Sequence, residues 1–253
     1  MQVKKEEIDS LAFGASVLKI EDVDINKDFA SFEKEYIRTY SPIYVYSKVE
    51  IENLQEIQYL EKNGFGFVET QFKKIRKIPK KPLGFVDPNF ELKKVEEETE
   101  LPDVYNAVDR IFNIDRVFLD KELDPNISKK RYRLYIKKSF FADNEVIYKL
   151  IDKSNGNIAG VYSHLFLDDK KTVVDLLGGI APEYKKTGAI AVIDDYVVSE
   201  FIKMGLKYSY TYLSACNYPI IELALKIMNA KLVQAYVVLR KIYKGDKNDR
   251  TNG

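Results

Sequence analysis

Residues 179–190, Gly-Ile-Ala-Pro-Glu-Tyr-Lys-Lys-Thr-Gly-Ala-Ile, combine the residue types that bind an anion. A proline, two adjacent lysines and a glycine stand between an apolar, β-branched run and a longer apolar segment. A turn from a strand into a helix can aim several main-chain N–H groups at one point, with the positive end of the helix dipole behind them. Because Lys185 and Lys186 lie beside these groups, the segment predicts a site for a phosphate or pyrophosphate.

Two elements must position this turn. Residues 172–177 are β-branched and apolar and predict a strand, whereas residues 190–204 predict a helix. The predicted anion ligands are the amides of Lys186, Thr187, Gly188, Ala189 and Ile190. The chain has no Gly-x-x-x-x-Gly-Lys-[Ser/Thr] string, which excludes a nucleotide P-loop. The alternative is an ordinary turn between a strand and a helix, which is a common use of proline and glycine.

The stretch 182–190 resembles the acetyl-CoA pyrophosphate loop of the GCN5-related N-acetyltransferases, the GNAT family, which reads roughly Pro-Glu-Tyr-Arg-Gly-Lys-Gly-Ile-Gly. In this register Lys185 stands where the family has Arg or Gln, and Gly188 matches the central glycine. Lys186 and Ile190 replace two family glycines, so the loop is a degenerate copy. The resemblance implies that the bound anion is the pyrophosphate of acetyl-CoA.

The elements after the loop follow the order of the C-terminal half of that family. Residues 206–214 predict a strand, Asn217 and Pro219 open a helix, and residues 232–239 predict a last strand. The resemblance implies that Asn217 meets the pantetheine arm of the cofactor.

The elements before the loop complete the same plan. Residues 104–112 and 126–140 predict helices, and strands at 146–151 and 158–167 are joined by a turn with Asn155-Gly156. The resemblance therefore implies an α+β protein with the GNAT acyl-CoA N-acyltransferase fold, in which helices flank a mixed, mostly antiparallel sheet.

The first half of the chain contains a looser copy of this pattern. Residues 55–70 predict a helix, a glycine cap and a strand, and residues 222–236 read the same way. We therefore expect a smaller, degenerate GNAT-like α/β domain at residues 1–95, a GNAT domain at residues 96–243 and a disordered tail at residues 244–253.

The basic stretch 73–82 follows this first copy. We interpret it as the solvated face of a strand that runs into a proline-broken linker, with contact to nucleic acid as the alternative.

A narrower resemblance concerns the acceptor. Short strings across residues 8–242, among them Phe13-Gly14, Gly64-Phe65 and residues 112–120, resemble the dTDP-4-amino-4,6-dideoxygalactose (fucosamine) N-acetyltransferases. This branch implies an acceptor of polysaccharide biosynthesis, a nucleotide-linked 4-amino-4,6-dideoxyhexose. Asp115 and Arg116 are then the predicted substrate-binding residues, because Arg suits bidentate phosphate binding. The alternative for these two residues is an intramolecular ion pair.

The reaction that the resemblance implies is direct attack of an amine on acetyl-CoA in a ternary complex. Main-chain groups of Gly179, Ile180 and Ala181 would align the pantetheine as an added strand. Anchoring the pyrophosphate far from the reacting carbon uses remote binding energy to position the thioester.

The groups that move protons are less well defined by the sequence. Asp175 lies on the strand that leads to the loop, and His164, the one histidine, lies on the neighbouring strand. Either is a candidate base, while a solvated Asp and a structural His are the alternatives. The family's thiolate-protonating Tyr has no counterpart, because Ala224 and Leu225 occupy its register. Tyr218, next to Asn217, is the catalytic candidate out of register.

Composition limits the partners. The chain has 253 residues, of which 45% are hydrophobic, and a net charge of +1, so no overall field favours nucleic acid or a membrane. One Cys and one His exclude a Cys/His zinc site and a disulfide framework, and we expect no metal and a cytoplasmic protein. A homodimer stays open. The competing hypotheses are another amine as acceptor, such as an amino acid, polyamine or peptide, and a non-catalytic acyl-CoA-binding role.

Overall fold

The computed structural model describes residues 1–243, so the predicted tail at residues 244–253 lies outside the described residues. The strands are β1 (Gln2–Lys5), β2 (Val17–Glu21), β3 (Tyr44–Glu50), β4 (Gly66–Lys77), β5 (Phe90–Lys94), β6 (Glu145–Asp152), β7 (Ile158–Phe166), β8 (Thr172–Ile180), β9 (Tyr208–Ser214) and β10 (Lys231–Ile242). The α-helices are α1 (Glu7–Phe13), α2 (Phe29–Tyr40), α3 (Leu54–Lys62), α4 (Leu101–Ile111), α5 (Arg116–Leu119), α6 (Pro125–Phe141), α7 (Ala189–Lys203) and α8 (Tyr218–Lys226). Short 3₁₀ turns lie at Glu98–Glu100 and Pro182–Tyr184.

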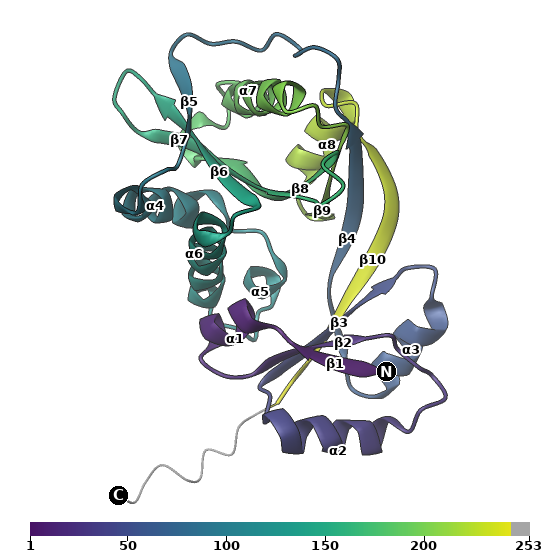
Figure 1. Ribbon diagram of the computed structural model, residues 1–253. Helices are drawn as coiled ribbons and strands as arrows, with labels where there is room; N and C mark the ends of the chain where they lie inside the picture. The colour runs from purple at the N-terminus through teal and green to yellow at the C-terminus, as the bar shows by residue number, and fades with distance from the viewer. Residues whose placement is uncertain (244–253) are drawn as a thin grey trace, which may run out of the picture.

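The strands form one ten-stranded sheet in the order β1-β2-β3-β10-β4-β9-β8-β7-β6-β5. Two pairs, β2 with β3 and β8 with β9, are parallel, and the other neighbours are antiparallel. In the second half of the chain α7 lies on one face of the sheet, and α4 and α6 lie on the other (Figure 1). This is the predicted mixed, mostly antiparallel sheet flanked by helices.

The sheet contains two related units that exchange their last strands. The first unit is β2-α2-β3-α3-β4, and the second is β8-α7-β9-α8-β10. In each unit the strand after the second helix pairs with the other unit, because β4 pairs with β9 and β10 pairs with β3. The six strands of the two units, in the order β2-β3-β10-β4-β9-β8, keep this order when the units are interchanged, and the exchange axis passes through the pair Gln71↔Tyr236. The predicted degenerate copy in the first half is therefore present (Figure 1).

The predicted division at residues 95 and 96 stays a prediction, and the sheet pairing runs across it. Strand β5 precedes residue 95 but pairs with β6, and β4 precedes it but pairs with β9. By their position in the sequence these strands belong to the first half, whereas their hydrogen bonds pair both of them with strands of the second half.

Local sequence explains the main element boundaries. Asp124 caps α6 by accepting the Asn126 amide, and Pro125 occupies the first turn, where no amide partner is needed. Asn155-Gly156 forms the predicted turn between β6 and β7, with Gly156 at φ 76°. Strand β8 extends to Ile180, beyond the predicted residue 177, because β7 pairs with it over its whole length.

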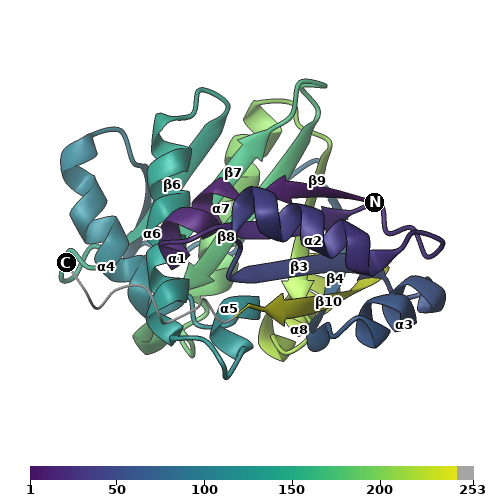
Figure 2. The same cartoon turned by 90° about the horizontal axis from the view of Figure 1, so that it is seen from below.

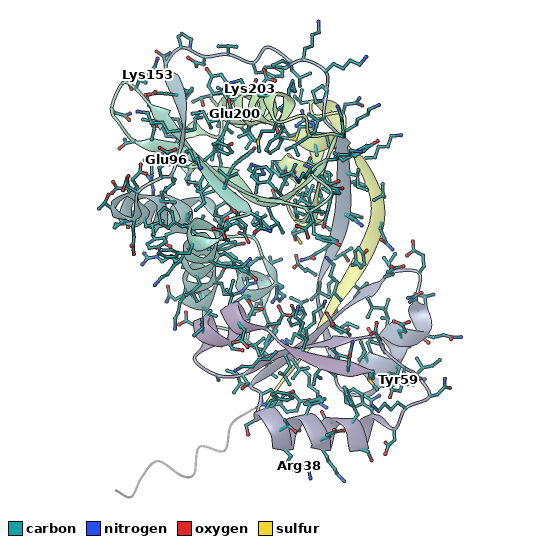
Figure 3. All side chains as sticks on the ribbon, in the orientation of Figure 1. Arg38, Tyr59, Glu96, Lys153, Glu200 and Lys203 are labelled. Carbon is teal, nitrogen blue, oxygen red and sulfur yellow. The ribbon has the colours of Figure 1, made fainter. Side chains whose placement is uncertain are left out.

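Each unit has its own hydrophobic core. In the first unit, α2 and α3 cover one face of the sheet (Figures 1 and 2), and Phe29, Phe32 and Leu60 from these helices pack against Ile20 and Val49. This core fills the space beside the β2–β3 pair. Charged residues such as Arg38 on α2 and Glu96 point outward (Figure 3).

A strap of residues 78–89 crosses the outer side of α7 and joins β4 to β5 (Figure 1). The carboxylate of Asp195 holds the strap by accepting the amides of Leu83, Gly84 and Phe85 at 2.6, 2.7 and 2.8 Å. The predicted linker thus exists as an extended segment tied to a helix.

Candidate functional site

Strands β8 and β9 part in the middle of the sheet. They pair only from Thr172↔Tyr208 to Val174↔Tyr210, and beyond these pairs β8 bonds to β7 alone. A β-bulge next to His164 lies where the strands separate, and bulges are over-represented beside active sites. Residues 176–180 therefore present one main-chain edge that pairs with no strand.

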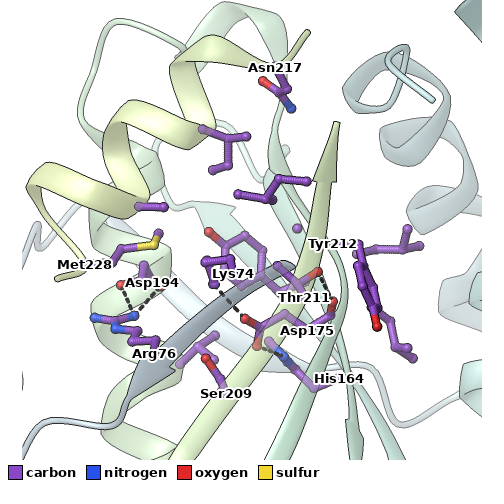
Figure 4. A pocket seen from close by; sticks show the side chains of 18 of the residues that line it. Lys74, Arg76, His164, Asp175, Asp194, Ser209, Thr211, Tyr212, Asn217 and Met228 are labelled. Atoms are coloured by element: carbon purple, nitrogen blue, oxygen red, sulfur yellow. Dashed lines mark hydrogen bonds and ion pairs between the residues drawn. The ribbon is translucent and has the colours of Figure 1, made fainter. Parts of the chain in front are cut away.

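A pocket of about 170 Å³ occupies the parting of these strands (Figure 4). Its lining comes from both faces of the sheet: Phe112, Ile114 and Tyr132 from the side of α4 and α6, and Val198 and Phe201 from α7. Because both faces contribute, the pocket passes between the strands instead of lying on one surface.

Charged residues form the floor of the pocket (Figure 4). Lys74 Nζ lies 3.0 Å from Asp175 Oδ2, and His164 Nδ1 lies 3.2 Å from Asp175 Oδ1. Burial by itself would raise the pKa of Asp175, but the charge of Lys74 and the contact with His164 hold it well below its usual range. The carboxylate of Asp175 is thus held between the ammonium group of Lys74 and the imidazole ring of His164.

The cations of this floor come from β4, in the first half of the chain. Arg76 Nη1 donates to both carboxylate oxygens of Asp194 on α7, at 2.8 and 2.9 Å. Lys74 and Arg76 are 6% and 4% exposed, so the interpretation of residues 73–82 as a solvated face is wrong for these two residues. They are buried because strand exchange places β4 beneath α7.

His164 is 1% exposed, and neither ring nitrogen has a well-aligned hydrogen-bond partner among residues 1–243. Tyr148, Tyr162 and Phe201 surround the ring, with Phe201 meeting it edge to face at 4.9 Å between centroids. A buried polar group without a partner is uncommon and is found at sites that move protons. The structure thus brings the two candidate bases, Asp175 and His164, together at the pocket.

The predicted anion loop is exposed and keeps free amides. Gly188 adopts φ 80° and precedes the first turn of α7, a conformation that glycine reaches without steric cost. The Thr187 amide bonds to Tyr184 O and the Ala189 amide bonds to Thr187 Oγ1, so these two are used within the loop. The amides of Lys186, Gly188 and Ile190 have no acceptor in the described part of the chain. Lys185 and Lys186 are exposed beside them.

The strand leading to this loop is shaped by close packing. A Cβ on Gly179 would lie 2.5 Å from Ile111 Cγ2, so glycine lets α4 approach β8. Ile180 and Ala181 are 8% and 0% exposed, and the Ala181 amide bonds to Ala159 O. Along β8 the pocket lining ends at Gly178, so Gly179, Ile180 and Ala181 lie between the pocket and the loop.

Asn217 and Tyr218 are neighbours with different surroundings. Asn217 begins α8 without capping it through its side chain, and it lines the pocket (Figure 4). Tyr218 is 75% exposed and lies outside the lining, so the structure does not bring its hydroxyl group to the pocket and its catalytic role stays a prediction. Ala224 lines the pocket, so no tyrosine occupies the family's usual register.

Asp115 and Arg116 belong to a buried ion network outside the pocket. Asp115 caps α5 by accepting the Val117 and Phe118 amides, each at 2.8 Å, and also pairs with Arg131. Arg116 pairs with Asp9. Burial opposes ionisation of Asp115, but Arg131 and these hydrogen bonds lower its pKa. Their contacts are those of the intramolecular alternative, and the substrate-binding role stays a prediction that the structure does not support.

Several pocket residues were not identified from the sequence. Lys74 and Thr211 contact Asp175, and neither was singled out, because only the pairing of β4 with β9 brings Lys74 there. The resemblance between residues 55–70 and residues 222–236 was the available sequence signal for two related units, but it does not reveal that the units exchange their last strands. Within residues 1–243 no cluster of His, Cys, Asp and Glu could hold a metal, and no helix is long and apolar enough to cross a membrane.

The sequence matches no protein-family model, and no curated protein sequence is similar to it. Solved structures are similar in shape at low identity. A GCN5-related N-acetyltransferase from Sphaerobacter thermophilus has a TM-score of 0.68 at 11% identity, covering 95% of this chain and 76% of its own. A tandem GNAT protein from the clavulanic acid biosynthesis pathway has a TM-score of 0.64 at 9% identity, covering 92% and 77%.

A GCN5-related N-acetyltransferase from Kribbella flavida has a TM-score of 0.62 at 10% identity, covering 91% of this chain and 82% of its own. These comparisons cover both units of this chain. The chain therefore has the α+β fold of the GCN5-related N-acetyltransferases, with a smaller degenerate unit before the unit that carries the pocket.

Proposed function

We propose that this protein is an N-acetyltransferase that moves an acetyl group from acetyl-CoA to a primary amine in a ternary complex. The observation that carries the proposal is the unpaired edge of β8 at residues 176–180, which lies between the pocket and the free amides of the loop. Three features in a row, a pocket, a strand edge and an anion site, suit a long cofactor with a thioester at one end and phosphates at the other.

The residues present suit the cofactor. The amides of Lys186, Gly188 and Ile190 would hold the pyrophosphate, with Lys185 adding charge. The edge of β8 would pair with the pantetheine amides as an added strand, and Asn217 would meet the same arm from α8. When bound, acetyl-CoA supplies the activated acyl group, and no metal enters the proposal.

The contacts of the two candidate bases, Asp175 and His164, support a limited role for them in proton transfer. His164 faces the carboxylate of Asp175, which can orient the ring. Asp175 is a poor proton acceptor by itself, because Lys74 keeps it ionised.

For the acceptor, we propose an amino sugar, in particular a nucleotide-linked 4-amino-4,6-dideoxyhexose. The short strings that resemble the fucosamine N-acetyltransferases support this class. The support does not extend to Asp115 and Arg116, which are engaged with Arg131 and Asp9.

The test combines binding with turnover. Calorimetry should find that the protein binds acetyl-CoA and binds acetyl-pantetheine, which lacks the pyrophosphate, at least tenfold more weakly. Thiol release should then be measured with dTDP-4-amino-4,6-dideoxygalactose, glucosamine, spermidine and glycine, and we expect the sugars to be the best acceptors. No affinity for acetyl-CoA would refute the proposal, whereas a preference for spermidine or glycine would refute only the acceptor class.

A second candidate function is acyl-CoA binding without catalysis. The ion pair that ties Asp175 to Lys74, and Ala224 in the register of the family's tyrosine, favour it. It predicts cofactor binding with no thiol release for any of the four amines.

A further inference from the structure

Glu69, on β4, is a buried carboxyl group with an unused oxygen. Its side chain is 1% exposed, Oε1 accepts a 2.7 Å hydrogen bond from Gln71, and Oε2 has no partner among the described residues. Burying an ionised carboxylate without a partner is costly, so native proteins pair such groups or use them. An unpartnered oxygen on a buried Glu therefore calls for a ligand.

The register of the sheet locates this oxygen beside the pocket. Gln71 of β4 pairs with Ser214 of β9, and Glu69, two residues earlier, shares the face of Gln71. That is the face of α5 and α6, where the charges of Tyr132 and Glu69 affect each other. Ser214 and Tyr132 both line the pocket, and Glu69 lies behind them, outside the lining. The Ser214 hydroxyl is close enough to Glu69 to lower the pKa of that carboxyl group, against the larger opposing effect of burial.

The charged groups around Glu69 do not neutralise it. Arg116, from α5, already pairs with Asp9, and Asp115 adds a negative charge. Lys48, on β3, forms no ion pair in the described chain and packs its Nζ 3.1 Å from the centre of the Tyr212 ring. Burial and neighbouring cations lower the pKa of Lys48 to about 7 although the charge of Glu69 opposes this shift, and burial raises the pKa of Glu69.

We propose that Glu69 binds the ammonium group of the acceptor and accepts its proton. The inference rests on the proposed function and deepens it. A proton passes from the acceptor nitrogen to Glu69 Oε2, the freed lone pair forms the bond to the acetyl carbonyl carbon, and the C–S bond breaks to release the CoA thiolate. Asp175 does not serve here because Lys74 occupies it, whereas Glu69 has a free oxygen.

The position of Glu69 depends on the exchange of strands between the two units. Glu69 lies in the first unit by sequence, yet β4 carries it between β10 and β9, next to the pocket of the second unit. The degenerate unit would thus complete the active site of the other unit through one exchanged strand.

The first experiment needs no substrate. Urea unfolding of the wild type, Glu69→Gln and the exposed control Glu96→Gln is followed from pH 4.5 to pH 8. A raised folded-state pKa means that folded Glu69 holds its proton at a pH where the unfolded chain has lost it. Wild-type stability should therefore fall relative to Glu69→Gln as pH rises from 4.5, and Glu96→Gln should track the wild type. A difference that does not change with pH would mean that Glu69 is already paired, and would overturn the inference.

The second experiment measures acetyl transfer to the best of the four amines above. We expect Glu69→Gln to lower kcat/KM by about 10²- to 10⁴-fold and to lose the acidic limb of the pH profile, with acetyl-CoA affinity unchanged by calorimetry. Glu69→Asp should recover part of the rate. Equal rates in wild type and Glu69→Gln would overturn the inference. Absence of acetyl-CoA binding in the wild type would instead refute the proposed function, and the pH-dependent stability would still decide whether Glu69 lacks a partner.

Discussion

The Thr211 hydroxyl donates a 2.6 Å hydrogen bond to the main-chain carbonyl of Asp175, where β8 and β9 part. The bond joins the two strands one residue beyond their last pair, Val174↔Tyr210. The first unit has a counterpart, because Ser47 on β3 donates to the carbonyl of Ile20 on β2 at 3.1 Å. In both parallel pairs a side-chain hydroxyl group thus bonds across the two strands. A hydrophobic core fills the space beside the β2–β3 pair, whereas a pocket lies beside the β8–β9 pair.

Replacing Lys74 by Met should destabilise the protein because it leaves Asp175 without its cation. Breaking a buried ion pair costs about 3 kcal/mol, and the double variant Lys74→Met/Asp175→Asn should recover part of this loss. The lowered pKa of Asp175 gives the wild type stability above the ordinary Asp pKa that is lost as pH falls. The deficit of Lys74→Met should therefore shrink between about pH 4 and about pH 2 in urea unfolding. A deficit of equal size at both pH values would argue against the pairing.

Gly179→Ala should strain the contact between β8 and α4. The added Cβ would lie 2.5 Å from Ile111 Cγ2, and β-branched Ile111 has little freedom to turn away. We expect a loss of about 1–3 kcal/mol in the free energy of unfolding. Gly66→Ala is the matched control, since its nearest neighbour would be the end of Arg240 at 3.7 Å. Similar midpoints for the two variants in thermal unfolding would contradict this account.

Asp195→Ala should release the strap over α7. The variant removes the acceptor of three amides, and hydrogen bonds to a charged group contribute about 1.5–3 kcal/mol each. The strap contains Lys80 and Lys81, so trypsin should cut it faster in Asp195→Ala than in the wild type. Asp168→Ala, at an exposed position, serves as the control. Unchanged cleavage in Asp195→Ala would show that the strap is held by other contacts.

Lys48→Met should change how stability depends on pH. The pKa of Lys48 is lowered to about 7 in the folded protein, so between pH 7 and its ordinary value the unfolded chain binds the extra proton. Wild-type stability should therefore rise with pH through this window, and below it the protonated, partly buried amine destabilises the fold. Lys48→Met should flatten the rise, while Lys153→Met, at an exposed lysine, should keep it. Equal slopes in denaturant titrations of Lys48→Met and Lys153→Met would contradict the lowered pKa.

Local patterns in the sequence were sufficient for most elements. The strand, the loop and the helix around Gly188 are where the alternation and the glycine predict them, because a strand-to-helix turn depends on its own residues. The repeated helix, cap and strand of residues 55–70 and 222–236 correctly indicated two related units, because each copy carries its own periodicity. Asn217 likewise lines the pocket, as its place before α8 suggested.

Pairing between distant strands decided the rest. Lys74 and Glu69 read as polar positions of a first-unit strand, and only the pairing of β4 with β9 and β10 brings them to the second unit. The sequence left Asp115 and Arg116 open between substrate binding and an intramolecular ion pair, and the fold supplies their ion-pair partners, Arg131 on α6 and Asp9 on α1. The sequence by itself determined the elements, the two copies and the loop before α7, whose causes lie within a few residues. The tertiary structure alone decided which charges are paired and which stay free, because these contacts join residues about one hundred positions apart.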